Sequence, residues 1–170
     1  MNQLPEVWLR GPLPQITPTL QPVGHALLQS AEEVLRYTHN FPPSLLWLKP
    51  GGMASVGFHL LHLTGVLDRL FSYAGGRQLS PAQLEYLQKE SLPHPDLTVT
   101  SLVAAFEKQI ESSLSSLAQT DPASLNDHRA VGRKALPSTT LGLLFHAAEH
   151  TQRHVGQLLV TIAFVKALQP

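Results

Sequence analysis

Three histidines stand four residues apart near the carboxyl-terminal end of the chain: His146, His150 and His154. Residues four apart lie on one face of an α-helix, about one turn from each other, so this spacing predicts a ladder of imidazoles. Imidazole nitrogens bind divalent transition metals at distances of about 2.0–2.1 Å. The ladder lies on a face that should be buried, where apolar packing gives no reason for three histidines. We therefore interpret it as a candidate metal site.

Two more histidines, His59 and His62, stand in an apolar stretch whose pattern predicts a helix. A pair from the last helix and one histidine from this helix could converge on a single ion. Three protein ligands leave a position open, either for water that the ion acidifies or for a substrate atom that it polarises. Zinc and nickel both suit imidazole, and an ion held by three neutral ligands keeps its double charge, which favours a thiolate or hydroxide. The spacing leaves open which histidines bind, and hydrogen bonding within the core is the alternative for His59.

Composition limits the classes of function. The chain of 170 residues carries 12 basic and 12 acidic side chains, so no net field favours nucleic acid or an anionic membrane. It contains no cysteine, which excludes disulfides, cysteine-ligated zinc and a thiol nucleophile. The chain shows neither a secretory signal pattern nor an apolar run of about 18 residues. We expect a cytoplasmic protein with no membrane span and no nucleic-acid partner.

Hydrophobic periodicity and capping signals predict helices throughout most of the chain. Four are long and one is short, at residues 19–41, 54–74, 80–91, 98–118 and from 138–140 to 168. The connection at 120–137 is polar, and its segment 127–131 fits a brief strand or coil. Because no strand pattern of any strength appears, the sequence predicts an all-α four-helix bundle with one short extra helix, in a single domain spanning 1–170.

The first 18 residues hold four prolines, which exclude a regular helix and predict an extended arm. Two large apolar side chains, Trp8 and Leu9, lie in this arm. We expect them to pack on the body of the domain; the alternative is an arm that reaches a second subunit.

The segments around the histidines carry a family resemblance. The sequences SVGFHLLHL at 55–63 and HTQRHVGQL at 150–158 resemble those of the DinB-like (YfiT-like) metalloenzyme family, and the likeness covers most of the chain. In that family, one histidine of the second helix and a His-x-x-x-His pair before x-Gly-Gln in the last helix hold nickel or zinc within a four-helix bundle. The resemblance therefore implies His62, His150 and His154 as the metal ligands.

The other polar residues near these positions become candidates for supporting roles. His59 and His146 are additional to the family pattern, as groups that support the ligands or line a pocket. Gln157 lies three residues after His154 on the same face, where its amide could orient a ligand or substrate. Glu149 is a candidate for acid–base work, with a salt bridge as its alternative role.

The resemblance also implies an activity. Similar proteins include S-transferases that use low-molecular-weight thiols and a thiol-dependent maleylpyruvate isomerase. This implies a metal-dependent enzyme acting on a small molecule, with bacillithiol or a related thiol as cosubstrate; metal-assisted hydrolysis is the second version. The catalytic group would be the metal-bound water or thiol. The rival is a non-catalytic, stress-linked bundle with a structural metal, which a fourth ligand such as His146 or His59 would favour. The apolar arm and the family habit predict a homodimer.

Overall fold

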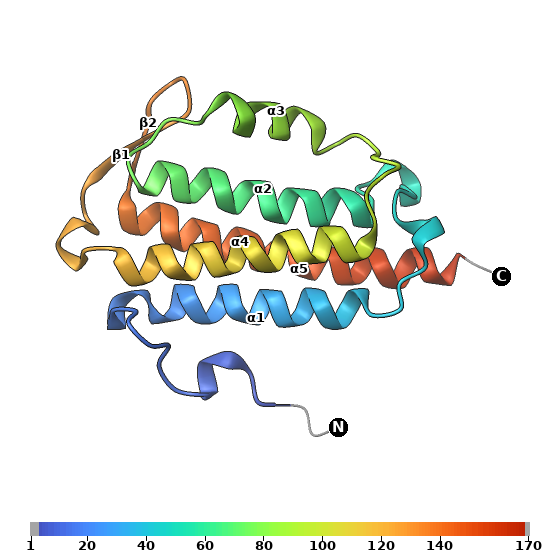
Figure 1. The fold of residues 1–170 in the computed structure, drawn as a ribbon, viewed down its shortest axis with the longest axis horizontal. Helices are drawn as coiled ribbons and strands as arrows, with labels where there is room; N and C mark the ends of the chain where they lie inside the picture. The colour runs from blue at the N-terminus through green and yellow to red at the C-terminus, as the bar shows by residue number, and fades with distance from the viewer. Residues whose placement is uncertain (1–3, 169–170) are drawn as a thin grey trace.

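The computed structural model describes residues 4–168, and four long helices make up most of it (Figure 1). The short α3 lies outside this bundle, against α2. The predicted all-α bundle with one short extra helix is confirmed. The helices are α1 (Gln21–Thr38), α2 (Val56–Ala74), α3 (Pro81–Lys89), α4 (Val99–Gln119) and α5 (Thr140–Ala167).

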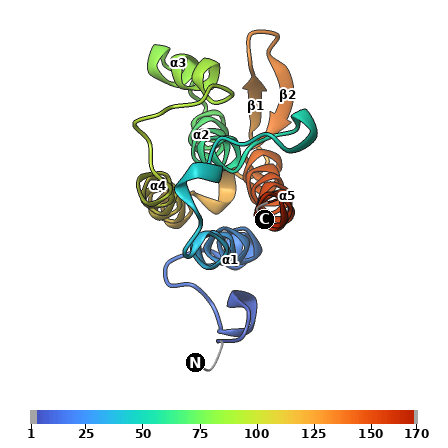
Figure 2. The same ribbon diagram turned by 90° about the vertical axis from the view of Figure 1, so that its right-hand side faces the viewer.

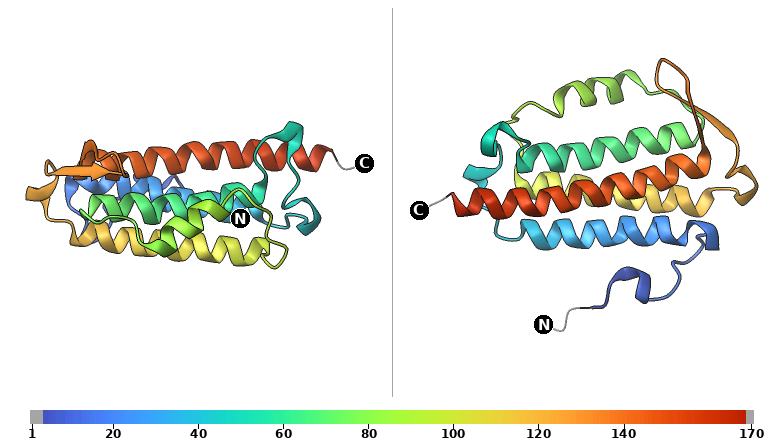
Figure 3. Two further views of the ribbon diagram at one scale, coloured as in Figure 1. Left: turned by 90° about the horizontal axis from the view of Figure 1, so that it is seen from above. Right: turned by 180° about the vertical axis from the view of Figure 1, so that it is seen from behind.

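The long helices form a square when viewed along the bundle (Figure 2). Helices α1 and α2 occupy opposite corners, and each packs against both α4 and α5. Helices α1 and α5 run in one direction, whereas α2 and α4 run in the other (Figures 1 and 3). Helix α3 carries the chain back along the outside of α2, so that α4 begins at the same end as α2. This crossover places α2 directly beside α5.

Local sequence sets where the helices begin. Helices α2 to α5 all start with a hydroxyl side chain that accepts a hydrogen bond from the backbone N–H three residues later, which satisfies one of the unpaired donors of the first turn. The caps are Ser55, Ser80, Thr98 and Thr139. The cap at Ser80 confirms the predicted start of α3. Of the three residues at 138–140 predicted as possible starts of α5, Thr139 is the cap.

Helix α2 lies at the centre of the core. Leu60, Leu63 and Leu67 are completely buried, as are Leu27 of α1 and Phe106 of α4. A helix that is apolar on most of its circumference needs neighbours on most sides, and α3, α4 and α5 supply them. Among residues 4–168, no helix combines the length and apolar character needed to cross a bilayer.

Two details differ from the sequence predictions. Strands β1 (His128–Val131) and β2 (Leu136–Thr139) form an antiparallel hairpin, of which the sequence suggested at most the first strand. Pro137 makes the second strand hard to predict, because proline is uncommon within strands. A two-stranded hairpin tolerates it because the outer edges of the hairpin are unpaired.

The arm is the second difference. It contains the 3₁₀ turn Val7–Leu9, and residues 1–3 of the predicted arm lie outside the described residues. The expectation that Trp8 and Leu9 pack on the domain is wrong, because their side chains are 62% and 57% exposed. Successive side chains of a 3₁₀ turn point in three directions, so only one of the three faces α1. That residue is Val7, which is buried.

The bundle core can be tested with two leucines of the same helix. Leu27→Ala should lower the free energy of unfolding by about 3–5 kcal/mol, because it removes a fully buried side chain and leaves a cavity. Leu35→Ala should change it by less than about 1 kcal/mol, because Leu35 is largely exposed. Urea unfolding of both variants measures the difference, and equal losses would contradict the orientation of α1.

Candidate metal centre

The packing of α2 on α5 brings three imidazoles together. His62 comes from α2, and His150 and His154 come from successive turns of α5. Their ring centroids are 4.4 to 5.3 Å apart, and each ring offers a nitrogen within 4.8 Å of the other two. We call these three residues the histidine cluster.

The spacing of the cluster suits one ion. The Nε2 atoms of His62 and His150 are 3.0 Å apart. For metal–nitrogen bonds of about 2.0–2.1 Å, neighbouring ligands of an octahedral or tetrahedral ion lie roughly 2.9–3.4 Å apart. Nδ1 of His150 is buried and has no hydrogen-bond partner among the described residues, so Nε2 is the nitrogen through which this ring meets His62.

Burial keeps two rings of the cluster neutral, which is the form that can bind a metal. Burial lowers the pKa of His150 to about 4, and nearby His62 contributes to the shift. Burial also lowers the pKa of His154 to about 3, again with a contribution from His62. The neutral imidazole is the form that binds a metal, so both side chains are in the binding form at neutral pH.

A buried carboxylate orients His62. The Oε2 atom of Glu90 lies 2.8 Å from Nδ1 of His62, and Glu90 is held in turn by the guanidinium of Arg69. Glu90 accepts a hydrogen bond from Nδ1–H of His62. This bond fixes the tautomer of His62 and leaves its Nε2 atom free to face His150. Metal-binding histidines commonly bond a carboxylate through their second nitrogen in this way.

Helix α3 delivers that carboxylate, and a glycine of α2 gives it room. Glu90 is the residue that caps the carboxyl-terminal end of α3. A Cβ atom built on Gly65 would lie less than 3.0 Å from atoms of Glu90, Arg69 and Tyr86. The hydroxyl of Tyr86 donates to the carbonyl of Leu61, which ties α3 to α2. The absence of a side chain at Gly65 therefore permits the close approach of α3.

His59 supports His154 from the other side. It is buried, and its Nδ1 atom lies 3.3 Å from Nδ1 of His154. Burial, with a contribution from His62, lowers the pKa of His59 to about 4, so its ring is neutral. When Nε2 of His154 faces the cluster, Nδ1–H donates to Nδ1 of His59. Nε2–H of His59 then points to the hydroxyl oxygen of Thr161 at 3.5 Å.

His146 and Glu149 are engaged with each other rather than with His62. Nδ1 of His146 lies 2.6 Å from Oε1 of Glu149, whose other oxygen accepts from Arg153. Burial raises the pKa of Glu149, but the hydrogen bonds from Arg153 and His146 outweigh this and lower it overall. These two residues and His150 form a second group with metal-ligand spacing, but His146 is largely exposed and the carboxylate already has two partners.

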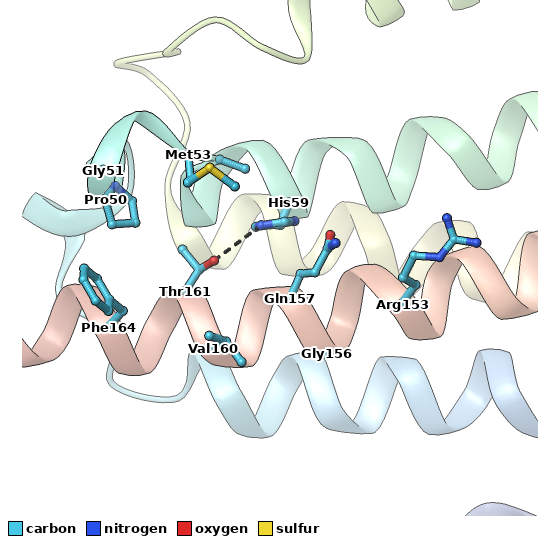
Figure 4. A pocket seen from close by; sticks show the side chains of 11 residues that line it. Pro50, Gly51, Met53, His59, Arg153, Gly156, Gln157, Val160, Thr161 and Phe164 are labelled. Carbon is cyan, nitrogen blue, oxygen red and sulfur yellow. Dashed lines mark hydrogen bonds between the residues drawn. The ribbon is translucent and has the colours of Figure 1, made fainter.

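Gln157 lies beside the cluster without bonding to it. It lines a pocket of about 760 Å³ together with His59 and Arg153 (Figure 4). The structure brings together the three histidines that the family resemblance implies, whereas Glu90 and Thr161 are contacts that the sequence did not predict. Glu90 lies 28 residues from His62 in a turn, where spacing carries no signal.

A helical bundle whose facing helices present converging histidines is compatible with a metal-binding protein. A family model described as the DinB superfamily matches residues 26–158, and the chain belongs to that superfamily. The expected family assignment is confirmed.

A solved structure and a search for curated relatives complete the comparison. The crystal structure of a structural-genomics target protein from Streptococcus pneumoniae is similar in fold, with a TM-score of 0.65. The two sequences are 14% identical, over 89% of this chain and 92% of that one. No curated protein matches the chain.

The contact from Glu90 can be tested by removing its charge. Glu90→Gln should lower the affinity of the cluster for zinc by about 10- to 100-fold, because the amide is a weaker acceptor for His62. Glu85→Gln is the matched control, since Glu85 is an exposed residue of α3 paired with Lys89. Competition with a chromogenic chelator measures both affinities, and equal values for the two variants would contradict the role of Glu90.

The lowered pKa values predict an effect of pH on the metal-free protein. Unfolded histidine takes up protons below about pH 6.5, whereas folded His59, His150 and His154 remain neutral down to about pH 3–4. The contribution of these three neutral side chains to the free energy of unfolding is therefore complete above pH 6.5 and is lost as the pH falls toward 4. Each group contributes up to about 1.4 kcal/mol per pH unit, and less where solvent screens it.

Chemical unfolding in the presence of a chelator measures this dependence. His154→Gln should flatten the pH dependence of stability between pH 6.5 and 4. His128→Gln, in the exposed start of β1, should leave it unchanged. A slope that is identical in the wild type and His154→Gln would show that His154 titrates normally.

Proposed function

We propose that the chain is a divalent-metal-dependent enzyme in which the histidine cluster holds nickel or zinc and activates a small-molecule thiol for transfer. The observation that supports this most directly is the convergence of three imidazole nitrogens within 4.8 Å. Two of those rings have pKa values lowered by burial, so they offer neutral ligands. Membership of the DinB superfamily is compatible with such a site.

Each supporting residue has a task in this proposal. A bound divalent ion would supply Lewis acidity, stabilising a thiolate or acidifying a water at the position left open by three protein ligands. Glu90 orients the ring of His62 through its Nδ1 atom, and His59 orients the ring of His154 in the same way. The ring of Phe58 stacks on His62 at 5.3 Å between centroids and shields that side of the ring from water.

The engagement of the nearby carboxylates favours thiol transfer over hydrolysis. The cluster includes no carboxylate, so the ion would keep its double charge and attract an anionic thiolate. The chain has no cysteine, and the thiol must come from a small molecule. Hydrolysis would profit from a free general base, but Glu90 and Glu149 are each held by an arginine and a histidine. Metal-assisted hydrolysis is therefore the second candidate.

A purely structural metal is the rival proposal. Structural sites usually have four protein ligands. The two histidines available for that role face elsewhere, because His59 bonds His154 through Nδ1 and His146 bonds Glu149. This arrangement supports a three-ligand site with an exchangeable position.

Metal binding can be tested with one control from the same helix. Zinc or nickel in 100-fold excess over its dissociation constant should stabilise the wild type by about 2.7 kcal/mol. His62→Ala, His150→Ala and His154→Ala should abolish most of this gain, and elemental analysis should show less than one ion per chain. His146→Ala should retain it. Equal loss in His146→Ala would make His146 a fourth ligand and favour a structural metal, and no gain in the wild type would refute the proposal.

Thiol transfer can be tested with a chromogenic electrophile. Metal-loaded protein should conjugate chlorodinitrobenzene to at least one thiol of a panel that includes bacillithiol, and His150→Ala should lose this activity. A nitrophenyl ester tests the second candidate. Hydrolysis of the ester without thiol conjugation would reverse the order of the two activities.

We also propose that the protein forms a homodimer. Trp8 and Leu9 are both exposed on the arm beside α1, where a second chain would cover them. Light scattering should give twice the 18.6 kDa of one chain, and the double variant Trp8→Ser, Leu9→Ser should give a monomer. A monomeric wild type would overturn this proposal.

A further inference from the structure

The pocket beyond His154 has two chemically different ends (Figure 4). At the end near the histidine cluster, His59, Gln157 and Arg153 present polar groups. At the far end, Pro50 and Phe164 belong to an apolar lining that also includes Met53 and Val160. A site of this kind suits a ligand with a polar head and an apolar body, because each part finds matching side chains.

The apolar lining is costly to leave in water. Met53, Val160 and Phe164 are 72%, 67% and 54% exposed, although they come from two separate segments of the chain. Large apolar side chains that gather around one cavity, rather than scattering over the surface, mark a binding site. The volume of about 760 Å³ falls within the range of pockets that hold small molecules.

The pocket lies next to the cluster: the three cluster histidines do not line it, but His59 does. Its inner wall is His59, which is buried and bonds His154 directly. Along α5, Thr161 lies seven residues beyond His154 on the same face of the helix, which corresponds to about 10 Å, and its neighbour Val160 also lines the pocket. A molecule with its head beside His154 and an extended body of that length would therefore reach the apolar lining of the pocket.

We propose that this pocket binds the apolar body of the enzyme's second substrate: a small amphiphile with an aliphatic or aromatic chain and a metal-binding or electrophilic head. This inference rests on the proposed function, since the head is placed at the histidine cluster. The pocket thereby selects substrates by the length and apolarity of the body. The polar thiol approaches from the solvent side of the cluster and does not occupy the pocket.

Hydroxamates of different length test the proposal on the zinc-loaded full chain. Acetohydroxamate carries a metal-binding head alone, whereas octanohydroxamate adds a body long enough to reach Val160. Calorimetry should show that octanohydroxamate binds about 10- to 100-fold more tightly, because its added methylenes leave water. Equal affinities would overturn the proposal while leaving the proposed function intact. Zinc binding without any hydroxamate binding would instead count against an open metal position.

Two aspartate variants separate the pocket from the rest of α5. Val160→Asp should remove the preference for the long hydroxamate and leave the affinity for acetohydroxamate unchanged. Leu159→Asp is the matched control: Leu159 is an exposed neighbour on the same helix and does not line the pocket, so this variant should keep the preference. Light scattering of Val160→Asp adds a further test. If this variant becomes monomeric and still prefers the long hydroxamate, a second copy of the chain covers the apolar face and the proposal fails.

Discussion

The contact between α2 and α5 is the interaction on which the rest of the structure depends. The two helices pack against each other, and both bury apolar side chains, including Leu63 of α2 and Leu158 of α5. Fully burying such a side chain stabilises the fold by about 1.5–3 kcal/mol, and a series of them offsets the cost of removing several imidazoles from water. The histidines are close together because apolar packing holds their helices together. Their own mutual interactions are a minor part of the energetics.

A second constraint is the buried ionic chain from Arg69 through Glu90 to His62. Buried ion pairs seldom stabilise a fold more than apolar residues of similar size would, because both charges lose their hydration. Their geometric effect is larger. Glu90 has defined partners on two turns of α2, which fixes both the position of α3 and the tautomer of His62.

The sequence predicted most of the fold because the relevant signals are local. Apolar periodicity and hydroxyl caps such as Ser80 and Thr139 act within a few residues. The hairpin was only partly predicted, because its exposed strands and Pro137 carry no alternating pattern. The arm was misjudged for a related reason: the composition of a 3₁₀ turn does not say which of its side chains faces inward.

The candidate site shows where spacing stops being informative. His146, His150 and His154 are equivalent by periodicity, and the place where α2 crosses α5 decides which two of them meet His62. That crossing is a property of the packed bundle. The role of Glu90 depends on an even longer connection, since it requires α3 to fold back and Gly65 to leave space.

The position of Glu90 at the end of α3 has a thermodynamic consequence. Its carboxylate reaches His62 only when α3 is docked on α2. The orientation of His62 and the docking of α3 are therefore thermodynamically coupled. Linkage requires that an ion bound through His62 tighten α3 by the same free energy by which docked α3 strengthens the ion's binding. The short helix is then a reporter of the site: its protection from hydrogen exchange would rise and fall with occupancy, although it contributes no ligand of its own.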